Sequence, residues 1–169
     1  MKTFSQYLDL QEKLILYQQG KKYGQIVFLA GGAGSGKGFA RDNFMEPEKF
    51  KIRDVDAWKT AFLKMSDLQD KYPEIKGLDL KNPKDVYKIH MFVKKLGIRD
   101  KSLDIMLADA NTKQLPNIMF DITFKDVSDI STIIPKLEAA GYQSKNIHLT
   151  WVLTNYAVSI LNNRDRERV

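Results

Sequence analysis

The sequence predicts an α/β fold: a mostly parallel β-sheet with helices packed on both faces, in a three-layer α/β/α sandwich. Short apolar runs with the length of buried strands alternate along the chain with segments of helical periodicity. The first run leads directly into a glycine-rich loop, and a helical segment follows that loop. Strands that alternate with helices are joined by right-handed crossovers, which place the strands in parallel.

An N-terminal extension, residues 1–20, is predicted to be helical. Its apolar side chains recur at helical spacing from about residue 4 to residue 19, and a glycine follows where a helix would end. The remaining residues, 21–169, have a length that is ordinary for one domain. Within this domain, residues 71–112 are expected to form a helical insertion that begins with an irregular, proline-containing stretch.

The elements of the main domain follow from its apolar patterns. Strands are predicted where short apolar runs are bounded by polar residues or glycine, at residues 25–30, 50–55, 117–122 and 146–153. Helices are predicted where apolar side chains recur every three or four positions, at residues 39–44, 57–68, 84–96, 101–111 and 126–140, and from about residue 155 onward.

Composition places the chain among soluble globular proteins. It has 169 residues, of which 43% are hydrophobic and 28% charged, and this argues against disorder. The absence of cysteine excludes a disulfide scaffold, a thiolate zinc site and a cysteine nucleophile. No apolar run has the length of a membrane helix, and the N-terminus lacks the pattern of a secretory signal. We therefore expect a cytoplasmic protein without a membrane partner.

The net charge of +6 does not indicate a nucleic-acid surface. Basic and acidic residues number 7 and 5 over residues 1–50, 13 and 10 over residues 51–110, and 7 and 6 over residues 111–169. The surplus is thus spread thinly, mostly as lysine interleaved with acids, which is typical of a solvated surface. The dispersed charge therefore argues against tight binding of DNA.

The most specific motif is the glycine-rich loop after the first strand, which has the pattern Gly-x-x-x-x-Gly-Lys. Backbone N–H groups of such a loop surround a polyphosphate, the following helix adds its positive end, and Lys37 bridges the β- and γ-phosphates. The alternative is a flexible glycine turn, against which the flanking strand and helix argue. The residues predicted to bind ATP are Gly31, Gly32, Ala33, Gly34, Ser35, Gly36, Lys37, Gly38 and Phe39.

One position departs from the usual phosphate loop. Gly38 follows the lysine where a hydroxyl residue usually coordinates Mg²⁺, and Phe39 offers no hydroxyl either. Ser35, inside the loop, is a candidate to assist. Mg²⁺ is expected to be held by phosphate oxygens, water and a carboxylate, which suits this octahedral ion.

Carboxylates follow two of the predicted strands. Asp54 and Asp56 come at the end of the second, and Asp121 comes at the end of the third, with Thr123 two residues later. Ligands of a parallel sheet lie beyond these strand ends, so Asp54, Asp121 and Thr123 are predicted to contact the substrate and Asp121 to bind the metal. The alternative for Asp54 and Asp56 is a helix N-cap or an exposed surface position.

Three of the six arginines lie at the end of the chain: Arg164, Arg166 and Arg168. Arginine neutralises the charge on a γ-phosphoryl group during transfer. We predict a catalytic role for Arg164 and Arg166. The alternative is a salt-bridged helix end, since Asp165 and Glu167 alternate with the arginines.

The order of these pieces resembles the zeta-toxin and polynucleotide-kinase-like group of P-loop kinases. The resemblance covers about residues 24–169. It rests on the phosphate loop from Gly31 to Lys37, on Asp54-Val55-Asp56, on Asp121-Ile122-Thr123, on Ala140-Gly141-Tyr142 and on Asn163-Arg164-x-Arg166. The resemblance implies a P-loop NTPase fold and an ATP- and Mg²⁺-dependent kinase.

The resemblance also implies roles for individual residues. Asp56 resembles the base that deprotonates a substrate hydroxyl, with Asp54 as the fallback, and Asp121 resembles the strand-end acid beside the substrate, with Thr123 as its hydroxyl partner. Arg164 and Arg166, with Arg168, resemble lid arginines that touch the ATP phosphates. The chain ends within this arginine motif, which suggests a lid truncated at residue 169. Its composition and N-terminal extension also fit a phage-encoded protein.

The predicted function is transfer of the γ-phosphoryl group of ATP to a hydroxyl or phosphate of a small molecule, a nucleotide or a nucleic-acid end. The expected partners are a nucleotide and an unidentified phosphate acceptor. Two alternatives remain open: an NTPase that acts without a small-molecule acceptor, and a degenerate kinase used as an interaction module, which the Gly38-Phe39 departure suggests.

Overall fold

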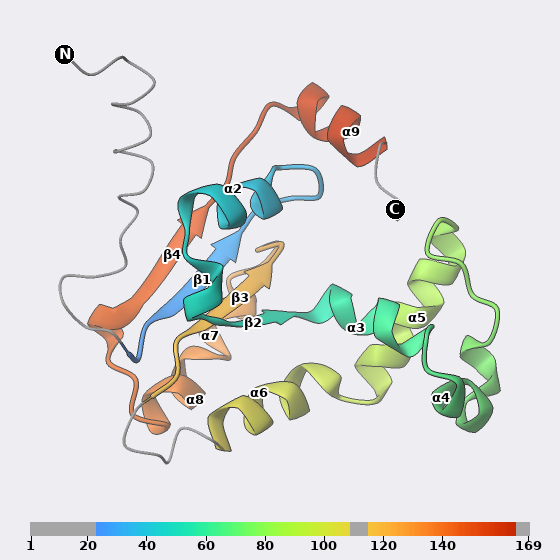
Figure 1. Cartoon of the computed structure of the whole chain (residues 1–169), viewed down its shortest axis with the longest axis horizontal. Helices are drawn as coiled ribbons and strands as arrows, with labels where there is room; N and C mark the ends of the chain where they lie inside the picture. Colours follow the sequence, from blue (N-terminus) through green and yellow to red (C-terminus); the bar gives the residue numbers. More distant parts are fainter. Residues whose placement is uncertain (1–22, 109–114, 165–169) are drawn as a thin grey trace.

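The computed structural model describes residues 23–108 and 115–164 (Figure 1). Four strands form one sheet: β1 (Ile26–Ala30), β2 (Lys51–Asp54), β3 (Ile118–Ile122) and β4 (Ile147–Trp151). The order across the sheet is β2-β3-β1-β4, and every pair is parallel. The predicted α/β fold with a parallel sheet is therefore confirmed. The helix predicted for the N-terminal extension lies outside the described residues.

The central and edge strands differ as their sequences suggest. All five residues of β1 and the first three of β3 are buried, in keeping with strands that are covered on both faces. The edge strands β2 and β4 keep exposed residues along their length. The apolar runs that predicted the two central strands thus reflect burial on both faces.

Helices connect the strands and cover the sheet. The 3₁₀ turns are Pro47–Lys49, Pro73–Ile75 and Ser144–Asn146. The helices of the described residues are α2 (Lys37–Phe44), α3 (Val55–Phe62), α4 (Ser66–Lys71), α5 (Pro83–Lys95), α6 (Ile98–Ala108), α7 (Ser128–Ser131), α8 (Ile134–Ala139) and α9 (Tyr156–Arg164).

The alternation of side chains along β1 and β3 gives the sheet two apolar faces. One face packs Phe28 on Phe120, with ring centroids 4.9 Å apart, and buries them beneath Leu103 of α6 and Leu137 of α8. On the other face Val27, Leu29 and Met119 form a cluster with Met45, which follows α2. Helical elements therefore cover both faces, as a three-layer sandwich requires.

A separate apolar cluster lies among the helices between β2 and β3. Phe62 of α3, Ile75, and Ile89, Phe92 and Val93 of α5 form its buried part. In Figure 1 these helices lie beyond the end of β2, beside the sheet rather than over it. This helical group has an apolar core distinct from the two that cover the sheet.

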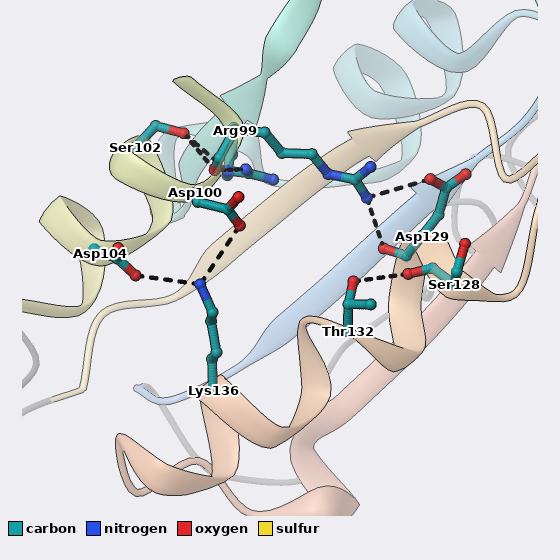
Figure 2. Close-up of polar contacts among 9 residues, drawn as sticks. Arg99, Asp100, Ser102, Asp104, Ser128, Asp129, Thr132 and Lys136 are labelled. Carbon is teal, nitrogen blue, oxygen red and sulfur yellow. Dashed lines mark hydrogen bonds and ion pairs between the residues drawn. The ribbon is translucent and has the colours of Figure 1, made fainter. Parts of the chain in front are cut away.

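Polar contacts attach α6 to the elements that follow β3 (Figure 2). Arg99 Nη2 lies 3.2 Å from Asp129 Oδ1 on α7, and Lys136 of α8 lies 3.5 Å from both Asp100 and Asp104 of α6. Beneath them the buried Arg53 of β2 donates to Ser102 Oγ of α6, at 3.2 Å, and to the carbonyl oxygen of Arg99. These contacts join α6 to both β2 and the helices under the sheet.

Two predicted helices are each divided in the structure. The segment predicted as one helix over residues 57–68 forms α3 and α4, because the backbone of Met65 is extended and starts a new helix; Gln69 Nε2 donates to the carbonyl oxygen of Leu63 at 2.7 Å. The segment 126–140 forms α7 and α8. Pro135 lacks an N–H group and is tolerated only in a first turn, so α8 starts at Ile134.

In the described residues, every helix falls short of the length and apolar character that a membrane crossing requires.

Candidate phosphate-binding site

The glycine-rich loop connects the end of β1 to the start of α2, as predicted (Figure 1). Gly34 and Gly36 adopt φ values of +74° and +92°, a left-handed conformation that side chains disfavour. Gly36 then precedes the first residue of α2, so the N-terminal amides of this helix face the loop. The local sequence thus produces the strand-loop-helix arrangement that binds anions.

Lys37 is the first residue of α2, and its ammonium group lies over the loop. Its Nζ donates to the carbonyl oxygens of Gly31, at 2.7 Å, and Gly32, at 3.3 Å. It also lies 3.7 Å from Asp121 Oδ1, and the Lys37 side chain is only 12% exposed. The structure therefore places one predicted phosphate ligand and one predicted strand-end acid in direct electrostatic contact.

Ser35 is the second notable side chain of the loop. Within the described part of the chain, its hydroxyl is the buried side-chain oxygen that has no hydrogen-bond partner. A Cβ added at Gly31 would lie 2.6 Å from this Oγ, so Gly31 leaves the room that the hydroxyl occupies. An unpaired buried hydroxyl inside an amide-lined loop fits a polyphosphate ligand, which would accept its hydrogen bond.

The carboxylates of β2 and β3 meet at the same edge of the sheet. Asp54 and Asp121 are partners in register, so both side chains lie on the face that α2 covers. Burial raises the pKa of Asp121, the charge of Lys37 opposes that rise, and the charge of Asp54 adds to it. Asp54 Oδ1 accepts hydrogen bonds from the backbone N–H groups of Asp56, at 2.8 Å, and Ala57, at 3.3 Å. Asp54 is thus an N-cap of α3, the alternative considered for it; its contact with substrate stays a prediction.

Asp56 and Thr123 are exposed beside this pair. Asp56 lies in the first turn of α3, where its Oδ1 is 2.7 Å from Lys59 Nζ. Thr123 directly follows β3. The next residue, Phe124, has a φ of +54°, which is unusual for a bulky side chain and turns the chain sharply after Thr123. The roles of Asp56 and Thr123 toward a substrate stay predictions.

The carboxylates near the loop fit a magnesium ion that binds together with its nucleotide. Among residues 23–108 and 115–164, no group of three or more histidine or acidic side chains could hold a metal ion alone. Mg²⁺ commonly takes one or two protein carboxylates and completes its octahedron with phosphate oxygens and water. Asp121, with Asp54 beside it, supplies that number of carboxylates near the loop.

The last helix, α9, contacts the loop directly. Asn162 Nδ2 donates to the carbonyl oxygen of Gly34 at 3.0 Å. A Cβ at Gly34 would lie only 2.1 Å from the carbonyl oxygen of Ser159, so the backbones of loop and helix touch. Arg164 is exposed at the end of this helix. Arg166 and Arg168 lie outside the described residues.

Arg41 and Asn162 belong to this site although sequence reasoning missed them. Arg41 follows Lys37 by one helical turn, and this spacing could have identified it. The hydrogen bond to Asp42 raises the pKa of Arg41, and the charges of Asp121 and Asp54 raise it further, which places all three charges near one another. The contact of Asn162 joins residues that are 128 positions apart and left no local signal.

Comparison with known protein families finds a match over most of the chain. The model of the family described as Zeta toxin matches residues 10–169, which confirms the resemblance predicted from the motifs. No curated protein and no solved structure matches the chain significantly.

Proposed function

The chain belongs to the zeta toxin family of P-loop kinase-like, ATP-binding domains, and from this premise we propose that it is an ATP-dependent phosphotransferase. It transfers the γ-phosphoryl group to a hydroxyl or phosphate of a small molecule, a nucleotide or a nucleic-acid end. The observation that carries the proposal is the contact between Lys37 and Asp121, 3.7 Å apart. It joins the ammonium group of the phosphate loop to the acidic edge of the sheet.

Each half of this arrangement has its own task. The loop amides and Lys37 hold the phosphates of ATP beyond β1, and the acceptor lies over the ends of β2 and β3. Phosphoryl transfer needs little covalent chemistry from a protein, because positioning and neutralisation of charge supply most of the catalysis. In this proposal the protein brings donor and acceptor to the same edge of one sheet.

Asp56 is the proposed base, as the family resemblance implies. Its exposed carboxylate takes the proton of the acceptor hydroxyl while the acceptor oxygen bonds to the γ-phosphorus. The bond from that phosphorus to the bridging oxygen of ADP breaks, and ADP leaves with the electron pair. Lys59 Nζ lies 2.7 Å from Asp56 Oδ1.

Mg²⁺, when bound with ATP, would neutralise phosphate charge, and Asp121 is the proposed carboxylate for it. Arg164 and Arg166 are proposed to neutralise the charge of the γ-phosphoryl group during transfer. Ser35 is proposed to donate its buried hydroxyl to a phosphate oxygen, since Gly38 has no hydroxyl to offer.

The test uses labelled ATP with a panel of nucleosides, nucleotides, UDP-sugars and oligonucleotide ends. The wild-type chain is expected to label at least one acceptor. Lys37→Ala is expected to lose ATP binding, whereas Asp56→Asn is expected to keep ATP binding and lose transfer. Asp67→Asn, an exposed aspartate in the first turn of α4, is the matched control and should retain both.

The outcomes separate the alternatives. ATP hydrolysis without labelling of any acceptor would indicate an NTPase. Failure to bind Mg-ATP at millimolar concentration would indicate a degenerate kinase. Normal transfer by Asp56→Asn would show that Asp56 is not the base.

A further inference from the structure

The contact between α9 and the loop joins one residue of the loop, Gly34, to the side chain of Asn162 and to the backbone of Ser159. The carbonyl oxygen of Gly34 accepts a hydrogen bond from Asn162, and the same glycine lies against the carbonyl of Ser159. Ser159 and Asn162 are three positions apart and so lie on one face of the helix. A single helical face therefore meets a single residue of the phosphate loop.

Apolar packing holds α9 only weakly. Its large apolar side chains are all exposed: Tyr156 at 79%, Val158 at 44%, Ile160 at 43% and Leu161 at 56%. The N–H of Ala157 donates to Asn155 Oδ1 at the start of the helix. Among the described residues, the hydrogen bond from Asn162 Nδ2 to the carbonyl oxygen of Gly34 attaches α9 to the loop. The position of the helix thus depends strongly on its attachment to the loop.

We propose that Asn162 is a positioning residue that aligns the arginine-bearing end of α9 with the terminal phosphate of ATP. This inference rests on the proposed function. Asn162 precedes Arg164 by two positions, so fixing the side chain of Asn162 on the loop also fixes where the helix presents the arginine. Charge neutralisation of a phosphoryl group is sensitive to displacements of about 1 Å, so one hydrogen bond can govern it.

The same bond orients the loop. It fixes the peptide plane after Gly34, the residue that precedes the buried hydroxyl of Ser35. A loop held in the bound shape before ATP arrives loses less conformational entropy on binding. Asn162 therefore links the end of α9 that carries Arg164 to the phosphate loop.

The test compares ATP with ADP in equilibrium binding, because only ATP has the γ-phosphate that the arginines would contact. Asn162→Ala is expected to weaken ATP binding about tenfold and ADP binding by less than about threefold, as expected for the loss of a contact to a charged group. Asn162→Asp has the same size but cannot donate to the carbonyl, and its added negative charge should weaken ATP binding at least as much as Asn162→Ala does. Leu161→Ala, an exposed neighbour, is the control and should bind both nucleotides as the wild type does.

A second background isolates the role of the arginines. In Arg164→Ala/Arg166→Ala, ATP binding should already be weakened, and adding Asn162→Ala should cause no further selective loss. Asn162→Ala could instead weaken ATP binding about tenfold in the double-arginine variant as well, or could weaken ATP and ADP binding equally. Either result would overturn the inference and show that Asn162 affects the loop alone. A wild-type chain that binds ATP but labels no acceptor would overturn the proposed reaction, while this binding comparison would still decide the role of Asn162.

Discussion

Asp54 and Asp121 lie opposite each other in register on the neighbouring parallel strands β2 and β3. Two carboxylates on one face of a sheet repel each other, and Asp54 contributes to the raised pKa of Asp121. Lys37 opposes this effect from the loop, at 3.7 Å from Asp121. The site is therefore an acidic pair with Lys37 and Arg41 as nearby cations. A magnesium ion bound with a nucleotide would add positive charge beside the two carboxylates.

Asp121→Asn is expected to stabilise the fold and impair transfer. The pKa of Asp121 is raised in the folded chain, so the folded state binds this proton more tightly than the unfolded state. Stability is therefore lost as pH rises through the raised pKa, and asparagine removes that loss. The melting temperature should rise at about pH 7, and the gain should shrink below about pH 4. The rate of phosphoryl transfer should fall about 100-fold, because the carboxylate proposed to bind Mg²⁺ is removed.

Asp104→Asn is the control for this change. It removes an exposed carboxylate of α6 whose ion-pair partner is Lys136 of α8, not a residue of the phosphate loop. It should alter neither the pH dependence of melting nor transfer. A melting temperature of Asp121→Asn that is below the wild type at neutral pH would contradict the expected cost of burying this charge.

Two substitutions separate the capping role of Asp54 from a chemical one. Asp54→Ala removes the acceptor for the N–H groups of Asp56 and Ala57 and should cost about 1 kcal/mol of folding free energy, measured by urea unfolding. Asp54→Asn caps a helix about as well and should leave stability unchanged. If Asp54 touches substrate, Asp54→Asn will still lower transfer. Wild-type transfer by Asp54→Asn would limit this residue to capping.

Gly34→Ala should weaken nucleotide binding far more than Gly32→Ala. A Cβ at Gly34 would lie 2.1 Å from the carbonyl oxygen of Ser159, and its φ of +74° disfavours any side chain. Gly34→Ala should lower the free energy of unfolding by at least about 1–2 kcal/mol. Because the added carbon displaces α9, ATP affinity should fall as well. At Gly32 nothing lies within 4 Å of the added carbon, so Gly32→Ala is the matched control. Isothermal titration of ATP and thermal unfolding measure both effects; equal losses for the two variants would argue against contact between loop and helix.

The buried Arg53 should tolerate methionine better than alanine. Its side chain is 3% exposed and lies over the ring of Phe120 at 5.4 Å, and burial lowers its pKa to about 10. Arg53→Ala leaves a cavity and should cost about 3 kcal/mol. Arg53→Met fills most of the volume and removes a buried charge that has no carboxylate partner among the described residues, so its cost should be below about 1 kcal/mol. Urea unfolding of both variants tests this, and equal costs would show that the guanidinium hydrogen bonds dominate.

The sheet and the phosphate loop were predictable because their signals are local. The apolar runs at residues 25–30 and 117–122 became β1 and β3, and the glycine pattern became the turn between β1 and α2. The break before Pro135 could also have been predicted, because proline is disfavoured in the interior of a helix.

Other features depend on contacts between distant segments. Arg53 is a charged residue of β2, and it is buried because Ser102 and Arg99 of α6 supply acceptors for its guanidinium group. Asp54 could have been predicted as a cap or as a ligand, and only the hydrogen bonds of α3 distinguish the capping role. The hydrogen bond between Asn162 and Gly34 joins residues that are 128 positions apart, so it depends on the fold of the whole sheet and not on the local sequence.

That last contact also sets an order in time. Gly34 and Asn162 are 128 residues apart in the chain, and synthesis proceeds from the N-terminus. A growing chain therefore exposes its phosphate loop long before α9 has left the ribosome. Contacts between residues so distant in sequence also form slowly during folding, because the intervening chain must first close on itself. The hydrogen bond that joins the phosphate loop to α9 can therefore form only after the chain has been made through Asn162.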